Sequence, residues 1–177
     1  MSAGCARGNE SGPGLAFGQA LLFLNILVAY DGSRSARRAW EQAIDLARSQ
    51  NSKLTVITVA PPVPPFAAFA GVSIERMKDE LETWAARMNR EAADAAPDGV
   101  VVHTVQRSGH AGEEIVKEID RGGYDLVVLG SRGHGQVGSS VLGSVNGYVH
   151  FHSKVALLSI DEPEHQGSAR PGSPSHG

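Results

Sequence analysis

Cysteine is almost absent from this sequence: the only one among 177 residues is Cys5, in the N-terminal segment. A single cysteine excludes an internal disulfide framework, and it excludes the Cys and His spacings that hold structural zinc. Few cysteines are also typical of proteins from reducing compartments. We therefore expect a cytoplasmic protein that is stabilised by a hydrophobic core rather than by covalent cross-links.

Long blocks of one charge are missing as well. The 16 basic and 19 acidic residues are spread along the chain and leave a formal net charge of -3. Nucleic acids and anionic membranes bind clustered basic residues, so we expect neither as a partner. The apolar stretch 15–30 is too short and too mixed to span a bilayer. It leads into Tyr30-Asp31-Gly32 without a small-residue cleavage site, so we do not read it as a secretory signal.

Short apolar runs alternate with segments of helical periodicity between residues 22 and 160. Such runs are typical of strands that are covered on both faces. The alternation predicts an α/β fold with one open, mainly parallel five-stranded sheet and helices on both faces, a Rossmann-like architecture. We expect one domain at 22–160 between disordered tails at 1–21 and 161–177. The expected strands are 22–30, 53–60, 100–107, 125–130 and 155–160.

Helices are expected between these strands. An apolar stripe that begins at Ala36 marks the first helix, and Ser73 is placed to cap the second. Gly122-Gly123 closes the third helix, and the fourth covers residues 139–152. The segment 61–72, rich in Pro and Phe, is predicted to have no regular structure.

Ligands of such sheets bind beyond the carboxyl ends of the strands, where the strand order reverses. Three segments meet this condition: the Asp31-Gly32-Ser33 turn, the end of the second strand at Val59, and the glycine-rich loop GSRGHGQVGSSVLGSV at 130–145. Within that loop, Gly133-x-Gly135-x-x-Gly138 has the form of a dinucleotide fingerprint, with Asp161 as its acidic residue. A dinucleotide fold needs further β-α units after the fingerprint, and only a polar tail follows Asp161. A dinucleotide enzyme is therefore the weaker hypothesis.

A wider glycine spacing in the same loop is Gly130-x2-Gly133-x9-Gly143-Ser144. With this spacing the chain resembles the universal stress protein family, whose nucleotide-binding members carry G-x2-G-x9-G-[ST] between the fourth strand and the fourth helix. The resemblance covers roughly residues 24–160. The matching blocks are ILVAYDGSRSARRAWEQAIDLA, LTVITVAPP, GHAGEEIVKEI, DLVVLGSRGHG and VLGSV.

The resemblance implies an adenine nucleotide, ATP, as the ligand, with Mg2+ beside it. It places Ala29 and the backbone of Val59 against the adenine, and Asp31 at the ribose or at a water molecule bound to Mg2+. The family positions that contact the rest of the nucleotide correspond to Leu129, Gly130, Gly133, Gly143, Ser144 and Val145. The chemistry agrees, because glycines allow close approach of the backbone and a helix N-terminus attracts anionic oxygens.

Each of these positions also has a structural alternative. Asp31 can cap the first helix, Ala29 and Val59 can be ordinary strand core, and the glycines can form a tight strand-to-helix turn. The loop lacks the Lys-[Ser/Thr] pair of a Walker loop. We therefore expect no dedicated enzyme and at most slow ATP hydrolysis.

The resemblance further implies a homodimer that pairs through the last strand, 155–160. The chain departs from the family here, because Ser153-Lys154-Val155 replaces the usual small residue, Pro and Val. The 61–72 loop is expected close to the adenine, where it covers or obstructs the site. The resulting hypothesis is a nucleotide-responsive regulator. The alternatives are a relative that binds cyclic AMP or AMP, and a dimeric interaction module without a nucleotide, whose protein partner is unknown.

Overall fold

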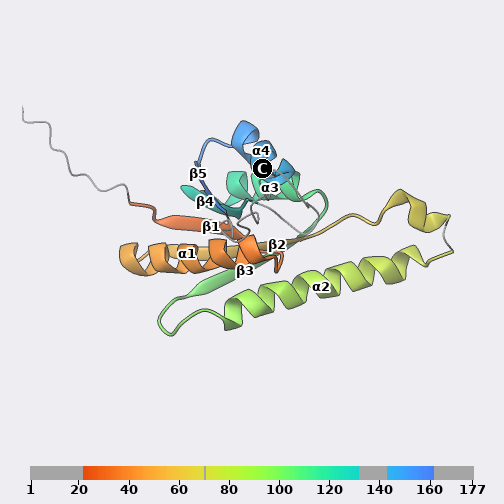
Figure 1. Cartoon of the computed structure of the whole chain (residues 1–177), viewed down its shortest axis with the longest axis horizontal. Helices are drawn as coiled ribbons and strands as arrows, with labels where there is room; N and C mark the ends of the chain where they lie inside the picture. Colours follow the sequence, from red (N-terminus) through yellow and green to blue (C-terminus); the bar gives the residue numbers. More distant parts are fainter. Residues whose placement is uncertain (1–21, 70, 132–142, 162–177) are drawn as a thin grey trace, which may run out of the picture.

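Five parallel strands form the centre of the fold in the residues that the computed structural model describes, 22–69, 71–131 and 143–161 (Figure 1). Their order across the sheet is β3-β2-β1-β4-β5. The order reverses between β1 and β4, which are adjacent in the sheet and far apart in sequence. The predicted fold class is confirmed. The strands are β1 Asn25–Ala29, β2 Lys53–Ala60, β3 Val102–Ser108, β4 Leu126–Gly130 and β5 Ala156–Ile160.

Helices cover both faces of this sheet. Side chains alternate between the two faces along each strand, so each face contributes apolar residues to its own core. Ile26 and Val28 of β1 pack in one core with α1 and α2, whereas Leu27 packs in a second core with α3 and α4. Trp40 of α1 is buried in the first core, as its place on the apolar stripe predicts. The α-helices of the described ranges are α1 Arg34–Gln50, α2 Ile74–Asp94, α3 Ala111–Gly122 and α4 Ser144–His152.

Local sequence signals explain most helix ends. The Ser73 hydroxyl accepts from the N–H of Arg76 at 3.3 Å, so the predicted cap of α2 is confirmed. Gly123 follows α3 in the left-handed conformation with φ 62°, which glycine adopts at little cost. The fourth helix begins at Ser144 with Gly143 at its N-cap position. Residues 139–142, where the prediction started this helix, lie outside the described residues.

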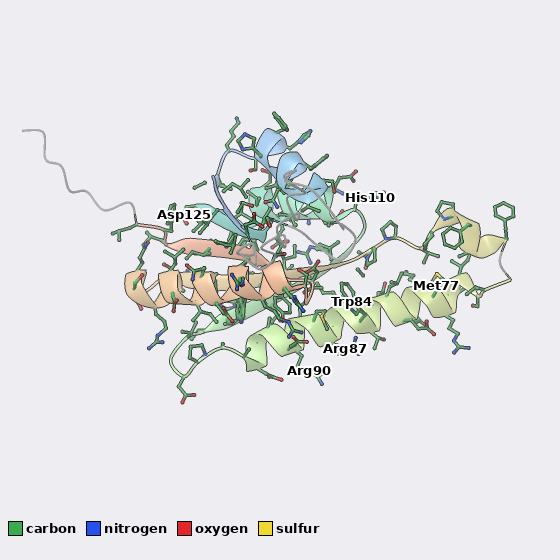
Figure 2. All side chains as sticks on the ribbon, in the orientation of Figure 1. Met77, Trp84, Arg87, Arg90, His110 and Asp125 are labelled. Carbon is green, nitrogen blue, oxygen red and sulfur yellow. The ribbon has the colours of Figure 1, made fainter. Side chains whose placement is uncertain are left out.

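The segment between β2 and α2 is more regular than predicted. Pro65–Ala68 form a short 3-10 helix, η1, in which the N–H of Ala67 donates to the carbonyl of Pro64 at 3.0 Å. A proline at the first position favours this turn because its φ is already close to the helical value. Phe66 and Phe69 are 67% and 92% exposed. With the N-terminal half of α2, which includes Met77, η1 extends well beyond the sheet (Figure 1, Figure 2).

The opposite end of the sheet is held by Asp125, just before β4 (Figure 2). Its carboxylate accepts from the N–H of Leu24 at 2.7 Å and from the N–H of Asn25 at 3.1 Å. These bonds align the start of β1 with the start of β4. The same two strands therefore end side by side at the carboxyl edge of the sheet, where the order reverses.

Candidate functional site

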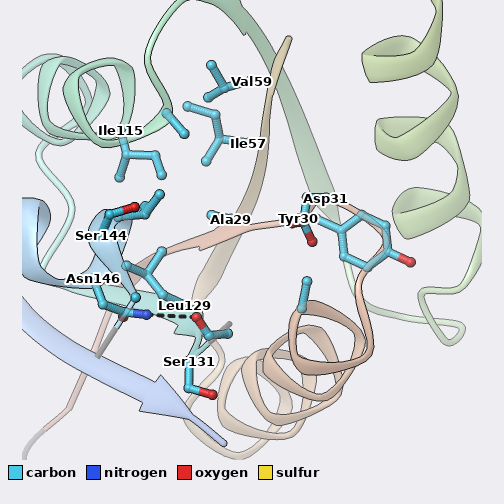
Figure 3. A pocket seen from close by; sticks show the side chains of 15 residues that line it. Ala29, Tyr30, Asp31, Ile57, Val59, Ile115, Leu129, Ser131, Ser144 and Asn146 are labelled. Atoms are coloured by element: carbon cyan, nitrogen blue, oxygen red, sulfur yellow. Dashed lines mark hydrogen bonds between the residues drawn. The ribbon is translucent and has the colours of Figure 1, made fainter. Parts of the chain in front are cut away.

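A cavity of about 330 Å³ opens at the carboxyl ends of β1 and β4, next to the reversal in strand order (Figure 3). Ile57, Ile115 and Leu129 make much of its wall apolar. Asp31 is the one charged side chain among the described lining residues. An apolar cavity with a few polar groups at this place in the fold is typical of a small-molecule site.

Residues predicted for the ligand site converge on this cavity from three strands and the start of α4. Eight of the nine line it, and their contact with a nucleotide stays a prediction. The ninth, Gly133, lies outside the described residues. The eight lining residues are Ala29, Asp31, Val59, Leu129, Gly130, Gly143, Ser144 and Val145.

Other lining residues were missed by the sequence reading. Ile57 lies two residues before Val59 on β2, so strand alternation places it on the same face. Ala111 and Ile115 are one turn apart on α3, which is a weaker signal for a site. Asn146 lies two residues after Ser144 in α4, and a single polar residue there forms no spacing that marks a site.

The 61–72 segment was expected near the adenine, and this stays a prediction. None of its described residues lines the cavity. β2 carries the chain past the cavity, and residues 61–64 then extend it outward to η1 (Figure 1). The described part of the segment is therefore not part of the cavity wall.

Asp31 closes a tight turn at the mouth of the cavity. Its Oδ1 accepts from the N–H of Ser33 at 2.9 Å, and Gly32 between them has φ 78°. The hydroxyl of Ser33, rather than Asp31, caps α1 by accepting from the N–H of Ala36 at 3.2 Å. The structural alternative for Asp31 is thus only partly right, because Asp31 orders the turn that precedes the cap.

Two glycines are required by close packing around the β4–α4 connection. A Cβ on Gly130 would lie 2.6 Å from Ser35 Oγ and 2.8 Å from the backbone nitrogen of Ala36. A Cβ on Gly143 would lie 2.8 Å from the carbonyl oxygen of Ser131. Gly130 therefore allows α1 to approach the end of β4, a role in packing that is separate from the predicted approach of a ligand.

Asn146 joins the two ends of this connection. Its Nδ2 donates to the carbonyl of Gly130 at 2.8 Å (Figure 3), and its side chain is almost fully buried. The N–H of Gly143 also donates to the carbonyl of Ser131 at 3.3 Å. Both bonds hold the N-terminus of α4 beside the end of β4, and a helix N-terminus has a dipole that favours an anion.

Comparison with known proteins agrees with this architecture. The model of the universal stress protein family matches residues 23–160, more than three quarters of the chain. The chain belongs to the universal stress protein family. The universal stress protein Sll1654 of Synechocystis sp. is 30% identical over 160 residues, which cover 90% of this chain and 99% of the relative.

Solved structures of universal stress proteins share the fold. One, determined in complex with cAMP, is 27% identical, covers 79% of this chain and 98% of its own, and has a TM-score of 0.60. Another, from Arabidopsis thaliana and with AMP bound, is 18% identical, covers 82% of this chain and 96% of its own, and also has a TM-score of 0.60. At 18% identity the second likeness supports the fold alone.

Residues 22–69, 71–131 and 143–161 of this universal stress protein contain neither a cluster of metal-ligating side chains nor a long apolar helix. Within those ranges, no group of three or more His, Cys, Asp or Glu residues is arranged to hold a metal ion. No helix there has the length and apolar character needed to cross a bilayer.

Tyr30 connects the cavity wall to α2. Burial of its ring, together with the hydrogen bond from its hydroxyl to Glu91, raises the pKa of Tyr30 to about 12. An unfolded tyrosine ionises near pH 10. Tyr30 therefore makes its full contribution to the free energy of unfolding below about pH 10. This contribution is lost progressively as the pH rises towards 12.

Between pH 9 and pH 11, the wild-type protein should lose about 1 kcal/mol more stability than Tyr30→Phe, which has no ionisable hydroxyl. Urea denaturation at the two pH values measures the difference. Tyr148→Phe, at an exposed ring on α4, is the matched control for removing a tyrosine hydroxyl. Equal losses for the wild type and Tyr30→Phe would contradict the prediction.

Proposed function

We propose that this universal stress protein binds an adenine nucleotide, ATP with Mg2+, in the cavity between β1 and β4, and acts as a nucleotide-responsive regulator in the cytoplasm. The observation that carries the proposal is the convergence of Asp31, Val59, Gly143 and Ser144 on one cavity. The solved relative in complex with cAMP, at 27% identity, supports an adenine ligand in this fold.

The cavity offers different chemistry to each part of a nucleotide. Ala29 and Val59 provide apolar surface for the base, and Asp31 provides an acceptor for ribose hydroxyls. Gly143 and Ser144, at the N-terminus of α4, provide backbone donors and a hydroxyl for phosphate oxygens. Bound Mg2+ would neutralise phosphate charge, and Asp31 is placed to hold it through a water molecule, since Mg2+ keeps several waters in protein sites.

The glycine loop favours a protein that responds to bound ATP over an enzyme that hydrolyses ATP quickly. The glycine loop has no Lys-[Ser/Thr] pair of the Walker type. Phosphoryl transfer needs a positioned cation and nucleophile, so hydrolysis should be slow if it occurs.

Equilibrium binding of labelled ATP to nucleotide-free protein tests the proposal. We expect saturable binding that Asp31→Ala weakens about 10-fold, because a charged hydrogen-bond acceptor is removed. Asp45→Ala, on the exposed face of α1, should bind like the wild type. A lack of saturable binding at millimolar ATP would overturn the proposal and leave the dimeric interaction module as the better hypothesis.

Cyclic AMP or AMP is the second candidate ligand. The solved structure with cAMP, at 27% identity, favours it. Competition against labelled ATP separates the ligands: displacement by cAMP at lower concentrations than by ATP would reassign the site to the cyclic nucleotide.

A homodimer through β5 is also proposed. The two edge strands differ, because β5 (ALLSI) presents half-buried apolar residues, whereas β3 (VHTVQRS) is polar. The N–H of Ala156 and the carbonyl of Ile160 bond to the β4 side. The backbone groups of Leu157 and Ser159 therefore point away from β4, towards a second copy.

Ser159→Pro should shift the protein from dimer to monomer, because proline removes an outward N–H and leaves the bonds to β4 intact. Sedimentation velocity of the variant and of the matched control Ser159→Ala measures the change. A dimeric Ser159→Pro protein would exclude pairing through this edge.

A further inference from the structure

Side chains from three elements meet beside the Asp31 turn. The hydroxyl of Tyr30, directly after β1, donates to Glu91 Oε1 on α2 at 2.7 Å. Arg37 on α1 approaches the same oxygen, with its Nη2 at 2.9 Å. The Nε of Arg37 donates to the carbonyl of Gly32 at 3.2 Å. Glu91 is thus linked directly to Tyr30, which precedes Asp31. Through Arg37 it is also linked to Gly32, which follows Asp31.

The backbone of Tyr30 is fixed as well. Its N–H donates to the carbonyl of Ile57 at 2.9 Å, and Thr58 Oγ1 donates to the carbonyl of Tyr30 at 2.8 Å. The ring reaches from the cavity towards α2, while Asp31, the next residue, lines the cavity (Figure 3). The contact of Glu91 that reaches the turn itself therefore runs through Arg37 to the carbonyl of Gly32.

We infer that Glu91 is a positioning residue for the Asp31 carboxylate and that it couples α2 to the nucleotide site. The inference rests on the proposed function of that site. Coupling between two sites is reciprocal, so a nucleotide that engages Asp31 stabilises the C-terminal part of α2, and a displacement of α2 changes nucleotide affinity.

The contacts of Glu91 allow this role to be separated from a role in folding. The side chains of Arg37 and Glu91 are 57% and 38% exposed, and ion pairs of that kind add little to global stability. Glu91→Ala should therefore remain folded. Glu91→Gln keeps an oxygen that accepts from Tyr30 and Arg37, so it should rescue the positioning effect. Glu80→Ala removes an exposed ion pair with Arg76 on the same helix and is the matched control.

Positioning is tested first in the ligand-free protein. The N–H of Ser33 is bonded to Asp31, so its hydrogen exchange, followed by NMR, reports whether the turn is closed. We expect exchange about 10-fold faster in Glu91→Ala and near the wild-type rate in Glu91→Gln and Glu80→Ala. An unchanged rate in Glu91→Ala would overturn the inference, whatever the protein binds.

Coupling is tested next by titration with ATP and Mg2+. We expect Glu91→Ala to weaken binding about 5- to 10-fold, and to have less than about 2-fold effect when Asp31 is already alanine. Equal losses in both backgrounds would show that Glu91 acts independently of Asp31 and would overturn the inference. Ser33 exchange can also increase in Glu91→Ala while the wild type binds no nucleotide. In that case the proposed function and the coupling to a nucleotide are both overturned, and only the positioning contact stands.

Discussion

Gly130→Ala is expected to destabilise the protein by about 2–3 kcal/mol, because overpacking against rigid backbone cannot be relieved by a change of rotamer. The new methyl group would lie 2.7 Å from the carbonyl carbon of Ser35 and 2.8 Å from the nitrogen of Ala36, both in the first turn of α1. Either α1 moves away from the end of β4 or β4 bends into the cavity. Both changes alter the wall of the proposed nucleotide site, so ATP binding should weaken as well.

Chemical denaturation of Gly130→Ala and Gly147→Ala measures the effect. Gly147 lies within α4, and a methyl group there would meet no described residue within 4 Å beyond the backbone of its own helix. Its replacement by alanine should therefore stabilise the protein by about 0.5–1 kcal/mol. If both variants have the same stability, the close approach of α1 does not explain the glycine at position 130.

Ala29→Leu is expected to reduce ATP affinity by about 100-fold, equivalent to about 2.7 kcal/mol, while the protein stays folded. Ala29 ends β1 at the floor of the cavity, next to Ile57 on β2 (Figure 3). A leucine there would add three carbon atoms to a space of about 330 Å³. The larger side chain extends into open volume rather than into packed core, so the cost to stability should be small.

Titration with labelled ATP and thermal unfolding should be measured on the same Ala29→Leu preparation. Ala86→Leu, on the exposed face of α2, is the matched control and should change neither result. Unchanged affinity in a folded Ala29→Leu protein would place the nucleotide elsewhere on the molecule.

Most of the fold could be predicted because the buried strands are recognisable in the sequence as short apolar runs. β1, β2 and β4 are apolar runs that are buried on both faces, and such runs are hard to mistake when helical stripes separate them. The 3-10 helix at Pro65–Ala68 was missed, since consecutive prolines suggested only an extended loop. Its formation depends on which proline occupies the first helical position, a detail finer than composition.

The candidate site was predictable only in part, for a different physical reason. Glycine spacing and strand ends place Asp31 and Gly143 at one edge of the sheet, and the structure brings them to one cavity. Contacts that depend on three-dimensional packing leave no local pattern. Glu91 lies 60 residues after Asp31 on a helix whose charges look like an ordinary solvated face, and Gly130 is required by a helix that precedes it by almost a hundred residues.

The unequal edges of the sheet limit how copies of this protein can assemble. A sheet with two apolar edges can add neighbours on both sides and grow without end. Here β5 is apolar and β3 carries His103, Gln106 and Arg107, which disfavour strand addition. A symmetric contact uses the same edge on both copies, so pairing through β5 leaves only polar edges exposed and closes the assembly at two.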